Sequence, residues 1–208
     1  ESQRYMKLSV DAIMAIAFAI ALGIVSVSRL FAPIFWGEDF APCAYILSAL
    51  ALSIPFSGFA NVIRMQYLIP NGMDGAYILS VILGAVSNLT ANSLLIPRCG
   101  ALGAAVGTVI AEGVVCAAQC LAVKKRIDIL AYLKSTAFFG MAGLLMYGAV
   151  QVLDQRAEIT VSWLLLEIVV GGSVYCILSV LYLYHTKNEL LMTALQKLGG
   201  AHQNNDRG

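Results

Sequence analysis

The chain has 208 residues, 60% of them hydrophobic and only 12% charged, with a formal net charge of +1. Water-soluble domains carry about 25% charged residues, so this composition excludes an ordinary soluble domain and indicates an integral membrane protein. The small net charge gives no sign of a nucleic-acid partner. Because the first residue is Glu1 and no signal peptide follows it, we expect the interior or C-terminal part of a longer protein, with an N-terminal part missing.

Six stretches of the sequence are each long and apolar enough to cross a bilayer, which takes about 20 residues. In chain order they are residues 11–35, 43–63, 76–96, 101–123, 133–153 and 161–184. The predicted fold class is therefore an all-α membrane protein with six transmembrane helices. Residues 1–8 and 186–208 are expected to be a cytoplasmic segment and a cytoplasmic tail.

The loops between the spans predict the orientation in the membrane. With the N-terminal end in the cytoplasm, the outer loops carry only Arg98 and Arg156, and every other Lys and Arg outside the spans falls on the inner side. Cationic residues concentrate in cytoplasmic loops, so both ends of the chain are predicted to be cytoplasmic.

The second and third spans each carry polar residues along one helical face, and Pro55 interrupts the backbone of the second. Hydrocarbon cannot satisfy amides and hydroxyls, so such a face must meet either protein or water. Hydrogen bonds between helices would explain one such face, whereas two in consecutive helices favour a hydrated cavity; both interpretations stay open at this point. The substrate-cavity candidates are Ser53, Ser57, Asn61 and Arg64 on the second span and Asn88 and Asn92 on the third.

The third and fourth spans are separated only by a short outer turn. Pro97 ends the third span, and Gly100 lets the chain reverse at once. Small residues then recur at helical spacing as Gly103, Gly107 and Ala111. Because small residues let membrane helices approach closely, this pattern predicts a helix-packing face, with a sliding surface in a moving bundle as the alternative.

Glu112 falls near the middle of the fourth span, whereas Asp11, Arg29 and Glu167 lie closer to the predicted membrane surfaces. A charge at the depth of Glu112 costs several kcal/mol unless it is paired, protonated or hydrated, which makes this residue a functional candidate. Glu112 is either a neutral side chain hydrogen-bonded to the third span, for example to Asn88, or an ion-coupling or substrate-contacting residue.

Residues typical of the active sites of soluble enzymes are nearly absent. The sequence has no glycine loop for phosphates and no metal-ligand cluster, and His185 and His202 fall at or beyond the inner membrane face. The five cysteines lie mostly within apolar stretches, which is typical of packing. We therefore expect no catalytic residues, no metal and no cofactor, and a protein that is not an enzyme.

Two segments, FAPIFWGEDFAPCAYIL and NVIRMQYLIPNGMDGAYILSVILGAVSNLTANSLLIPRCGALGAAVGTVIAE, carry a family resemblance. They resemble the C-terminal half of the Wzx-type oligosaccharide-lipid flippases. These are polysaccharide biosynthesis transporters of the multidrug/oligosaccharidyl-lipid/polysaccharide (MOP) exporter superfamily. The match runs from about residue 4 to residue 185 and is most specific over residues 31–112.

The resemblance implies a MATE-like bundle of two six-helix lobes around a central cavity. Residues 9–123 would supply four helices that complete the second lobe, and residues 124–185 two appended helices. The implied activity is the flipping of an undecaprenyl-diphosphate-linked oligosaccharide across the bacterial inner membrane by alternating access. The implied partners are this lipid-linked oligosaccharide and membrane lipids, with glycan polymerases and glycosyltransferases as candidates. Arg64 either meets the diphosphate at the cytoplasmic mouth or is an ordinary positive-inside anchor.

Other functions stay open. An ion-coupled exporter of drugs or other small molecules within the same superfamily would need an acidic cation site, for which Glu112 is the candidate. A membrane enzyme of envelope synthesis, such as a glycan polymerase, would call for a long outer loop with basic residues. A purely structural membrane subunit would need neither feature.

Overall fold

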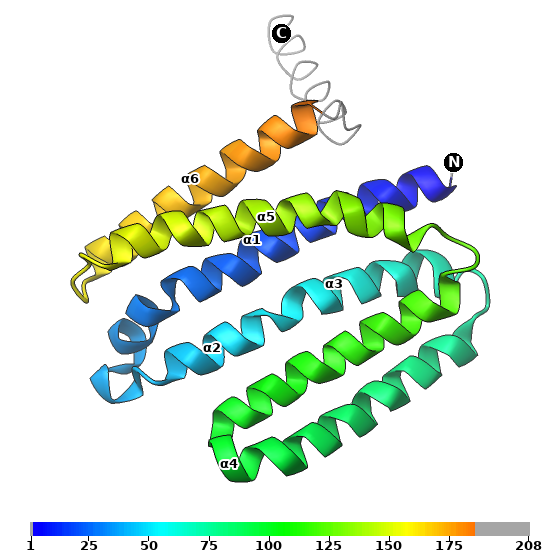
Figure 1. Cartoon of the computed structure of the whole chain (residues 1–208), viewed down its shortest axis with the longest axis horizontal. Coiled ribbons are helices and arrows are strands. Elements are labelled where there is room, and N and C mark those ends of the chain that lie inside the picture. Colours follow the sequence, from blue (N-terminus) through cyan, green and yellow to red (C-terminus); the bar gives the residue numbers. More distant parts are fainter. Residues whose placement is uncertain (1, 186–208) are drawn as a thin grey trace, which may run out of the picture.

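The computed structural model describes residues 2–185, so Glu1 and the expected cytoplasmic tail at 186–208 lie outside the described residues. The described chain is built of helices only, which confirms the predicted all-α class (Figure 1). In chain order these are α1 (Ser2–Trp36), the 3-10 turn η1 (Glu38–Phe40), α2 (Cys43–Ala51), α3 (Ser53–Ile63), the π-helical turn η2 (Arg64–Leu68), α4 (Asp74–Val123), α5 (Ile129–Asp154) and α6 (Val161–His185).

Five helical stretches of the described chain are long and apolar enough to cross a membrane, and not the six that the sequence predicts. The difference lies in α4, which takes up the third and fourth predicted spans as one element of 50 residues. Its backbone reverses at Gly100, where φ is 56° and ψ is −133°, a conformation that residues with a Cβ rarely adopt. Gly100 therefore divides α4 into a first arm, residues 74–99, and a second arm, residues 101–123, which run antiparallel (Figure 1).

The second predicted span is not a single regular helix. α2 ends at Ala51 and α3 begins at Ser53, close to Pro55. Because Pro55 has no backbone N–H, it cannot donate a hydrogen bond to the carbonyl of Ala51, and the helical ladder is interrupted at this point.

The π-helical turn η2 follows α3 directly. The Ile69 N–H donates to the Arg64 carbonyl, five residues back, at 3.0 Å. Ile63 and Leu68 are both 0% exposed, although residues five apart on an α-helix would face directions about 140° apart. The wider turn therefore brings both side chains onto the buried side of the segment.

The helices lie side by side, with α1 in the middle (Figure 1). α1 contacts α2 and α3 as well as α5 and α6, and α3 in turn contacts α4. The start of α1 and the α3–α4 and α4–α5 connections lie at one end of the bundle. The α1–α2 connection, the reversal of α4 and the α5–α6 connection lie at the other end. Successive connections thus lie at alternate ends of the bundle, as expected for helices that cross the same membrane one after another.

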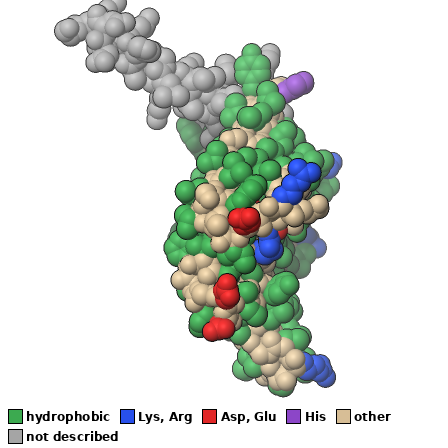
Figure 2. Space-filling model, turned by 90° about the vertical axis from the view of Figure 1, so that its left-hand side faces the viewer, with side chains coloured by type: hydrophobic (Ala, Val, Ile, Leu, Met, Phe, Trp, Pro, Cys, Tyr) green, Lys and Arg blue, Asp and Glu red, His purple; other side chains and the backbone are tan. Residues whose placement is uncertain are grey.

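The core is small and the exterior is apolar. Met6 and Val10 are buried, and α1 accordingly begins at Ser2 instead of near the predicted residue 11. Phe139 of α5 is fully buried in the same cluster. Many other large apolar side chains, such as Leu89, point outward, and the face in Figure 2 is largely hydrophobic with few charged groups. Lipid tails are as apolar as these side chains, so such an exterior suits a bilayer.

Candidate functional site

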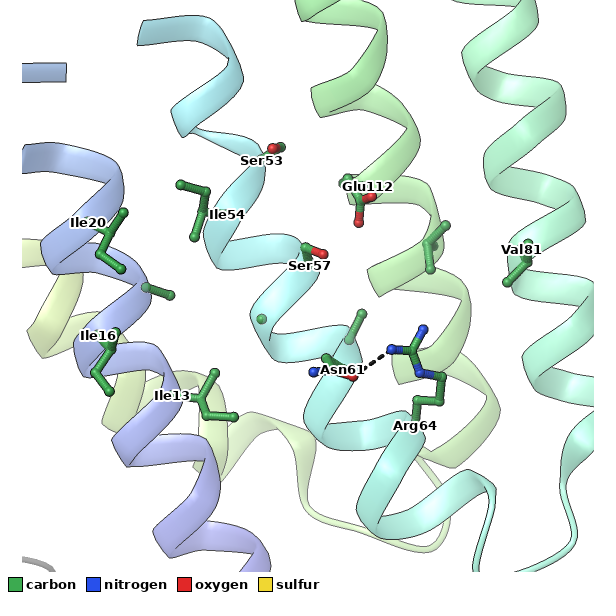
Figure 3. A pocket seen from close by; sticks show the side chains of 14 residues that line it. Ile13, Ile16, Ile20, Ser53, Ile54, Ser57, Asn61, Arg64, Val81 and Glu112 are labelled. Carbon is green, nitrogen blue, oxygen red and sulfur yellow. Dashed lines mark hydrogen bonds between the residues drawn. The ribbon is translucent and has the colours of Figure 1, made fainter. Parts of the chain in front are cut away.

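A groove of about 660 Å³ lies between α1, α3, η2 and α4 (Figure 3). Its α1 wall is aliphatic and contains Ile13, Ile16 and Ile20. The polar side chains that line it are Ser53, Ser57 and Asn61 of α3, Arg64 of η2 and Glu112 of the second arm of α4. The three α3 side chains recur every four residues, which places them on one face of the helix. The groove thus brings the predicted cavity residues of the second span together with the predicted ion-coupling residue.

Arg64 is held by two neighbours in this groove. Its Nη2 donates to Asn61 Oδ1 at 2.5 Å, and its guanidinium carbon lies 5.3 Å from the centroid of the Tyr77 ring on the first arm of α4. A guanidinium near an aromatic ring is attracted by the ring's quadrupole. Within residues 2–185 no other hydrogen-bond partner of the Arg64 side chain is found, so its remaining N–H groups can donate to an anion.

Glu112 points into the groove beside Ser53 and Ser57 (Figure 3). Its carboxylate has no hydrogen-bond or ion-pair partner in the described part of the chain. The predicted alternative of a hydrogen bond to Asn88 is wrong, because Asn88 Oδ1 instead accepts from Asn92 Nδ2 at 2.9 Å. Glu112 is therefore open to water, to a cation or to hydroxyl donors of a substrate.

Asn88 and Asn92 do not line this groove. They bond to each other along the first arm of α4, and Asn92 also contacts the second arm, where its Oδ1 lies against Gly107. This Oδ1 is buried and has no hydrogen-bond partner in residues 2–185. The polar face of the third span therefore meets the second arm of α4, through Asn92. From the first arm, Val81 lines the groove.

The small residues of the second arm lie where the two arms of α4 touch. Gly103 is buried, and a Cβ added there would stand 2.5 Å from the Leu95 carbonyl oxygen. Gly107 is buried against Asn92, and the Ala111 carbonyl lies 3.5 Å from where a Cβ of Gly84 would stand. Larger side chains at these positions would push the arms apart.

Three other ionisable side chains lie deeper in the protein, or are better paired, than the sequence suggests. Asp11 is 2% exposed and accepts a hydrogen bond from Ser135 Oγ at 2.7 Å. Arg29 pairs with Asp154 at the end of α5, and Glu167 is fully buried. Arg29 and Asp154 both lie toward the outer ends of their predicted spans, but the sequence gives no sign that α1 and α5 pack together there.

Within residues 2–185 no group of three or more His, Cys, Asp or Glu side chains could hold a metal ion. Cys116 and Cys120 are both free and lie in apolar surroundings on the second arm of α4. The groove itself offers hydroxyls, an amide, one guanidinium and one carboxylate, which suit hydrogen bonding to a polar solute.

Membrane-length helices, an apolar exterior and a polar groove between the helices indicate an integral membrane protein. The fold is similar to that of a solved structure described as lipid II flippase MurJ in an inward closed conformation. The TM-score is 0.78 at 18% sequence identity, over 90% of this chain and 40% of that one. No family model and no curated protein matches the sequence.

The chain therefore spans less than half the length of the flippase structure whose fold it shares. At this low identity the likeness concerns the fold alone. It confirms that the described helices share the fold of part of that structure, whereas membership of the MOP superfamily and of the Wzx-type family within it stays a prediction.

Proposed function

We propose that this chain is part of a flippase that moves a lipid-linked oligosaccharide across the bacterial inner membrane for polysaccharide or cell-envelope synthesis. The observation that carries the proposal is the groove, which opposes an aliphatic wall on α1 to a polar face on α3, η2 and α4. A lipid-linked glycan has the same two parts, because its sugar hydroxyls and diphosphate are polar and its lipid chain is a hydrocarbon. The shared fold with a lipid II flippase supports the same class of substrate.

Each polar group of the groove has a role in this proposal. Ser53, Ser57 and Asn61 donate to and accept from sugar hydroxyls, because hydroxyls and amides can do both. Arg64 binds the diphosphate, since its guanidinium keeps free donors after bonding to Asn61. We propose undecaprenyl diphosphate as the carrier, and alternating access as the mechanism. Glycan polymerases and glycosyltransferases are the proposed partners.

Replacing Arg64 with glutamine in the transporter that contains this chain should slow flipping by about tenfold to a hundredfold. A hydrogen bond to a charged group contributes about 1.5–3 kcal/mol, and each 1.4 kcal/mol is about a tenfold change. The measurement is transbilayer movement of a fluorescent diphosphate-linked oligosaccharide in proteoliposomes. Arg98→Gln is the matched control, because Arg98 is exposed and lies outside the groove. Equal flipping by the two variants at equal incorporation would contradict the assignment of Arg64.

An ion-coupled exporter of small molecules is the second candidate, favoured by the unpartnered Glu112 carboxylate in the groove. The same proteoliposomes discriminate between the two functions when a proton or sodium gradient is applied. In the exporter, Glu112→Gln abolishes the dependence of small-molecule transport on the gradient. In a flippase without ion coupling at this residue, Glu112→Gln leaves the pH dependence of flipping unchanged.

We also propose that both chain ends face the cytoplasm, on the strength of the charge distribution of the loops. Native Cys99 beside the reversal of α4 is exposed and should react with a membrane-impermeant maleimide added outside intact cells, in a Cys43→Ser background. A cysteine introduced by Lys125→Cys in the α4–α5 connection should react only after the cells are opened. Reversed accessibility of these two cysteines would overturn the orientation.

A further inference from the structure

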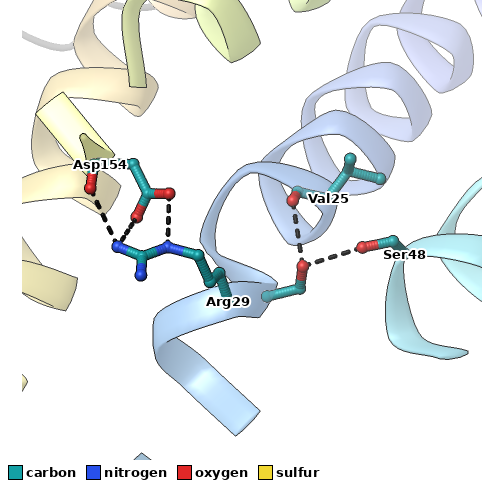
Figure 4. A network of polar contacts seen from close by, with 5 residues as sticks. Val25, Arg29, Ser48 and Asp154 are labelled. Carbon is teal, nitrogen blue, oxygen red and sulfur yellow. Dashed lines mark hydrogen bonds and ion pairs between the residues drawn. The ribbon is translucent and has the colours of Figure 1, made fainter. Parts of the chain in front are cut away.

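Arg29 and Asp154 form a two-point ion pair where α1, α5 and α6 meet (Figure 4). Arg29 Nη2 donates to Asp154 Oδ1 at 2.6 Å and to the Asp154 carbonyl at 2.9 Å, while Nε donates to Oδ2. The Asp154 side chain is 9% exposed and the Arg29 side chain 50% exposed. The two charges compensate each other, so the pair is electrically neutral.

Glu167 of α6 is the third ionisable group at this junction. It is 0% exposed, and neither carboxyl oxygen has a hydrogen-bond partner within residues 2–185. It lines a largely apolar cavity of about 370 Å³ between α1, α5 and α6, together with Met146 and Val150. Arg29 on α1 and Asp154 on α5 are the charged groups that act on it electrostatically. The titratable side chains of Tyr175 and Cys176 on α6 line the same cavity.

The junction holds two acidic groups and one cation. Asp154 takes the hydrogen bonds of Arg29 on both carboxylate oxygens, so an ionised Glu167 has no counter-charge of its own. A buried, unpaired carboxylate costs several kcal/mol, and in practice such a group takes up a proton instead. A protonated Glu167 loses its charge and gains an O–H donor, and the carboxylate of Asp154 is the neighbouring acceptor.

We propose that Glu167 is a proton-binding site, separate from the groove, whose carboxyl group is protonated at neutral pH and faces Asp154 and Arg29. When the proton leaves, the junction passes from neutral to one net negative charge, and two carboxylates compete for one guanidinium. The site therefore couples a protonation event to the contacts that hold α5 and α6 on α1. It does not depend on the proposed substrate.

A second cavity gives the proton a route to this site. Asp154 lines a more polar cavity of about 560 Å³ with Arg29, Tyr147 and Gln151, next to the α5–α6 connection. Ser26, buried on α1, lines both this cavity and the one that contains Glu167. The two cavities therefore adjoin at Ser26, and the polar one is the side from which the proposed proton would enter, separately from the groove.

Infrared spectroscopy of the purified chain in lipid tests the proposal. At neutral pH the wild-type spectrum should contain a carboxylic-acid C=O band that shifts in D2O and is absent from Glu167→Gln. Glu158→Gln, which changes an exposed carboxylate in the α5–α6 connection, should keep this band. If Glu167→Gln instead loses only ionised-carboxylate intensity, Glu167 is charged at neutral pH and the proposal is overturned. A carboxylate band that responds to Na⁺ would identify a metal-cation site and overturn it as well.

The pH dependence of thermal unfolding gives a second readout. The folded chain keeps a proton that the unfolded chain releases above about pH 4.3, so the wild type should lose stability as pH rises through the titration of Glu167. Glu167→Gln, whose amide resembles the protonated acid, should fold and lack this loss. If Glu167→Gln does not fold, Asp11→Asn and Glu112→Gln assign the band instead, because both variants should keep it if it belongs to Glu167. A wild-type melting temperature that rises over the same range contradicts proton binding.

Discussion

Replacing Arg29 with leucine is expected to lower the free energy of unfolding by about 2–3 kcal/mol, because it leaves a buried carboxylate without its cation. The effect is smaller than the roughly 3–5 kcal/mol of a fully buried pair because the Arg29 side chain is half exposed. Asp154 is 9% exposed and receives all of its ion-pair hydrogen bonds from Arg29. The loss should appear as a lower unfolding midpoint and a lower yield of folded chain in lipid.

Two further variants separate the ion pair from a general charge effect. Arg156→Leu removes the same charge from an exposed position in the α5–α6 connection and should change stability little. The double variant Arg29→Leu with Asp154→Leu should recover most of the loss, because apolar replacement of both members of an ion pair leaves no buried charge unpaired. A double variant as unstable as Arg29→Leu alone would show that the side-chain packing of Arg29, and not its charge, is what matters.

Gly103→Ala is expected to destabilise the chain by about 3 kcal/mol, at the upper end of the usual cost of overpacking. The added methyl group would stand 2.5 Å from the Leu95 carbonyl oxygen and 2.9 Å from the Ile96 nitrogen. Both are backbone atoms, which cannot move aside as a side chain can. The two arms of α4 must therefore separate or unwind near Gly100. Unfolding in detergent or lipid, followed by circular dichroism, measures the effect.

Gly113→Ala is the matched control on the same arm, because a Cβ there meets no atom within 4 Å. Alanine is a better helix former than glycine by about 1 kcal/mol, so this variant should be neutral or slightly more stable. The two substitutions are chemically identical and are predicted to act in opposite directions. Equal stability of the two variants would mean that the arms of α4 are not in close contact at Gly103.

Hydropathy predicted the positions of the membrane-length segments well, and spacing predicted the polar face of the second span. The reversal of the chain at Gly100 was also predicted correctly, although no loop separates the two arms of α4, so the structure has five membrane-length stretches instead of six. Helical periodicity identifies a polar face but does not say what that face meets. The faces of Asn61 and Asn92 therefore looked alike in sequence, although Asn61 lines the groove and Asn92 lies between the arms of α4.

The junction of α1, α5 and α6 was the hardest part to predict. Arg29 and Asp154 are 125 residues apart in sequence, and each alone resembles a side chain that reaches the membrane surface. Glu167 likewise lies close enough to the start of α6 to suggest a surface position. Which helices pack against each other determines whether such residues meet headgroups or one another. Loop charges and hydropathy carry no information about that choice.

The wider turn of η2 makes the length of this connection unusually tolerant of change. In a regular helix, losing one residue turns everything beyond it by about 100°. Deleting one residue between Arg64 and Leu68 would instead leave Ile63 and Leu68 four residues apart and about 40° apart on a regular α-helix, so both side chains would stay on the buried side. A π-helical turn is what a single inserted residue leaves in an ordinary helix, so evolution or design can add or remove that residue while the hydrophobic contacts on either side persist.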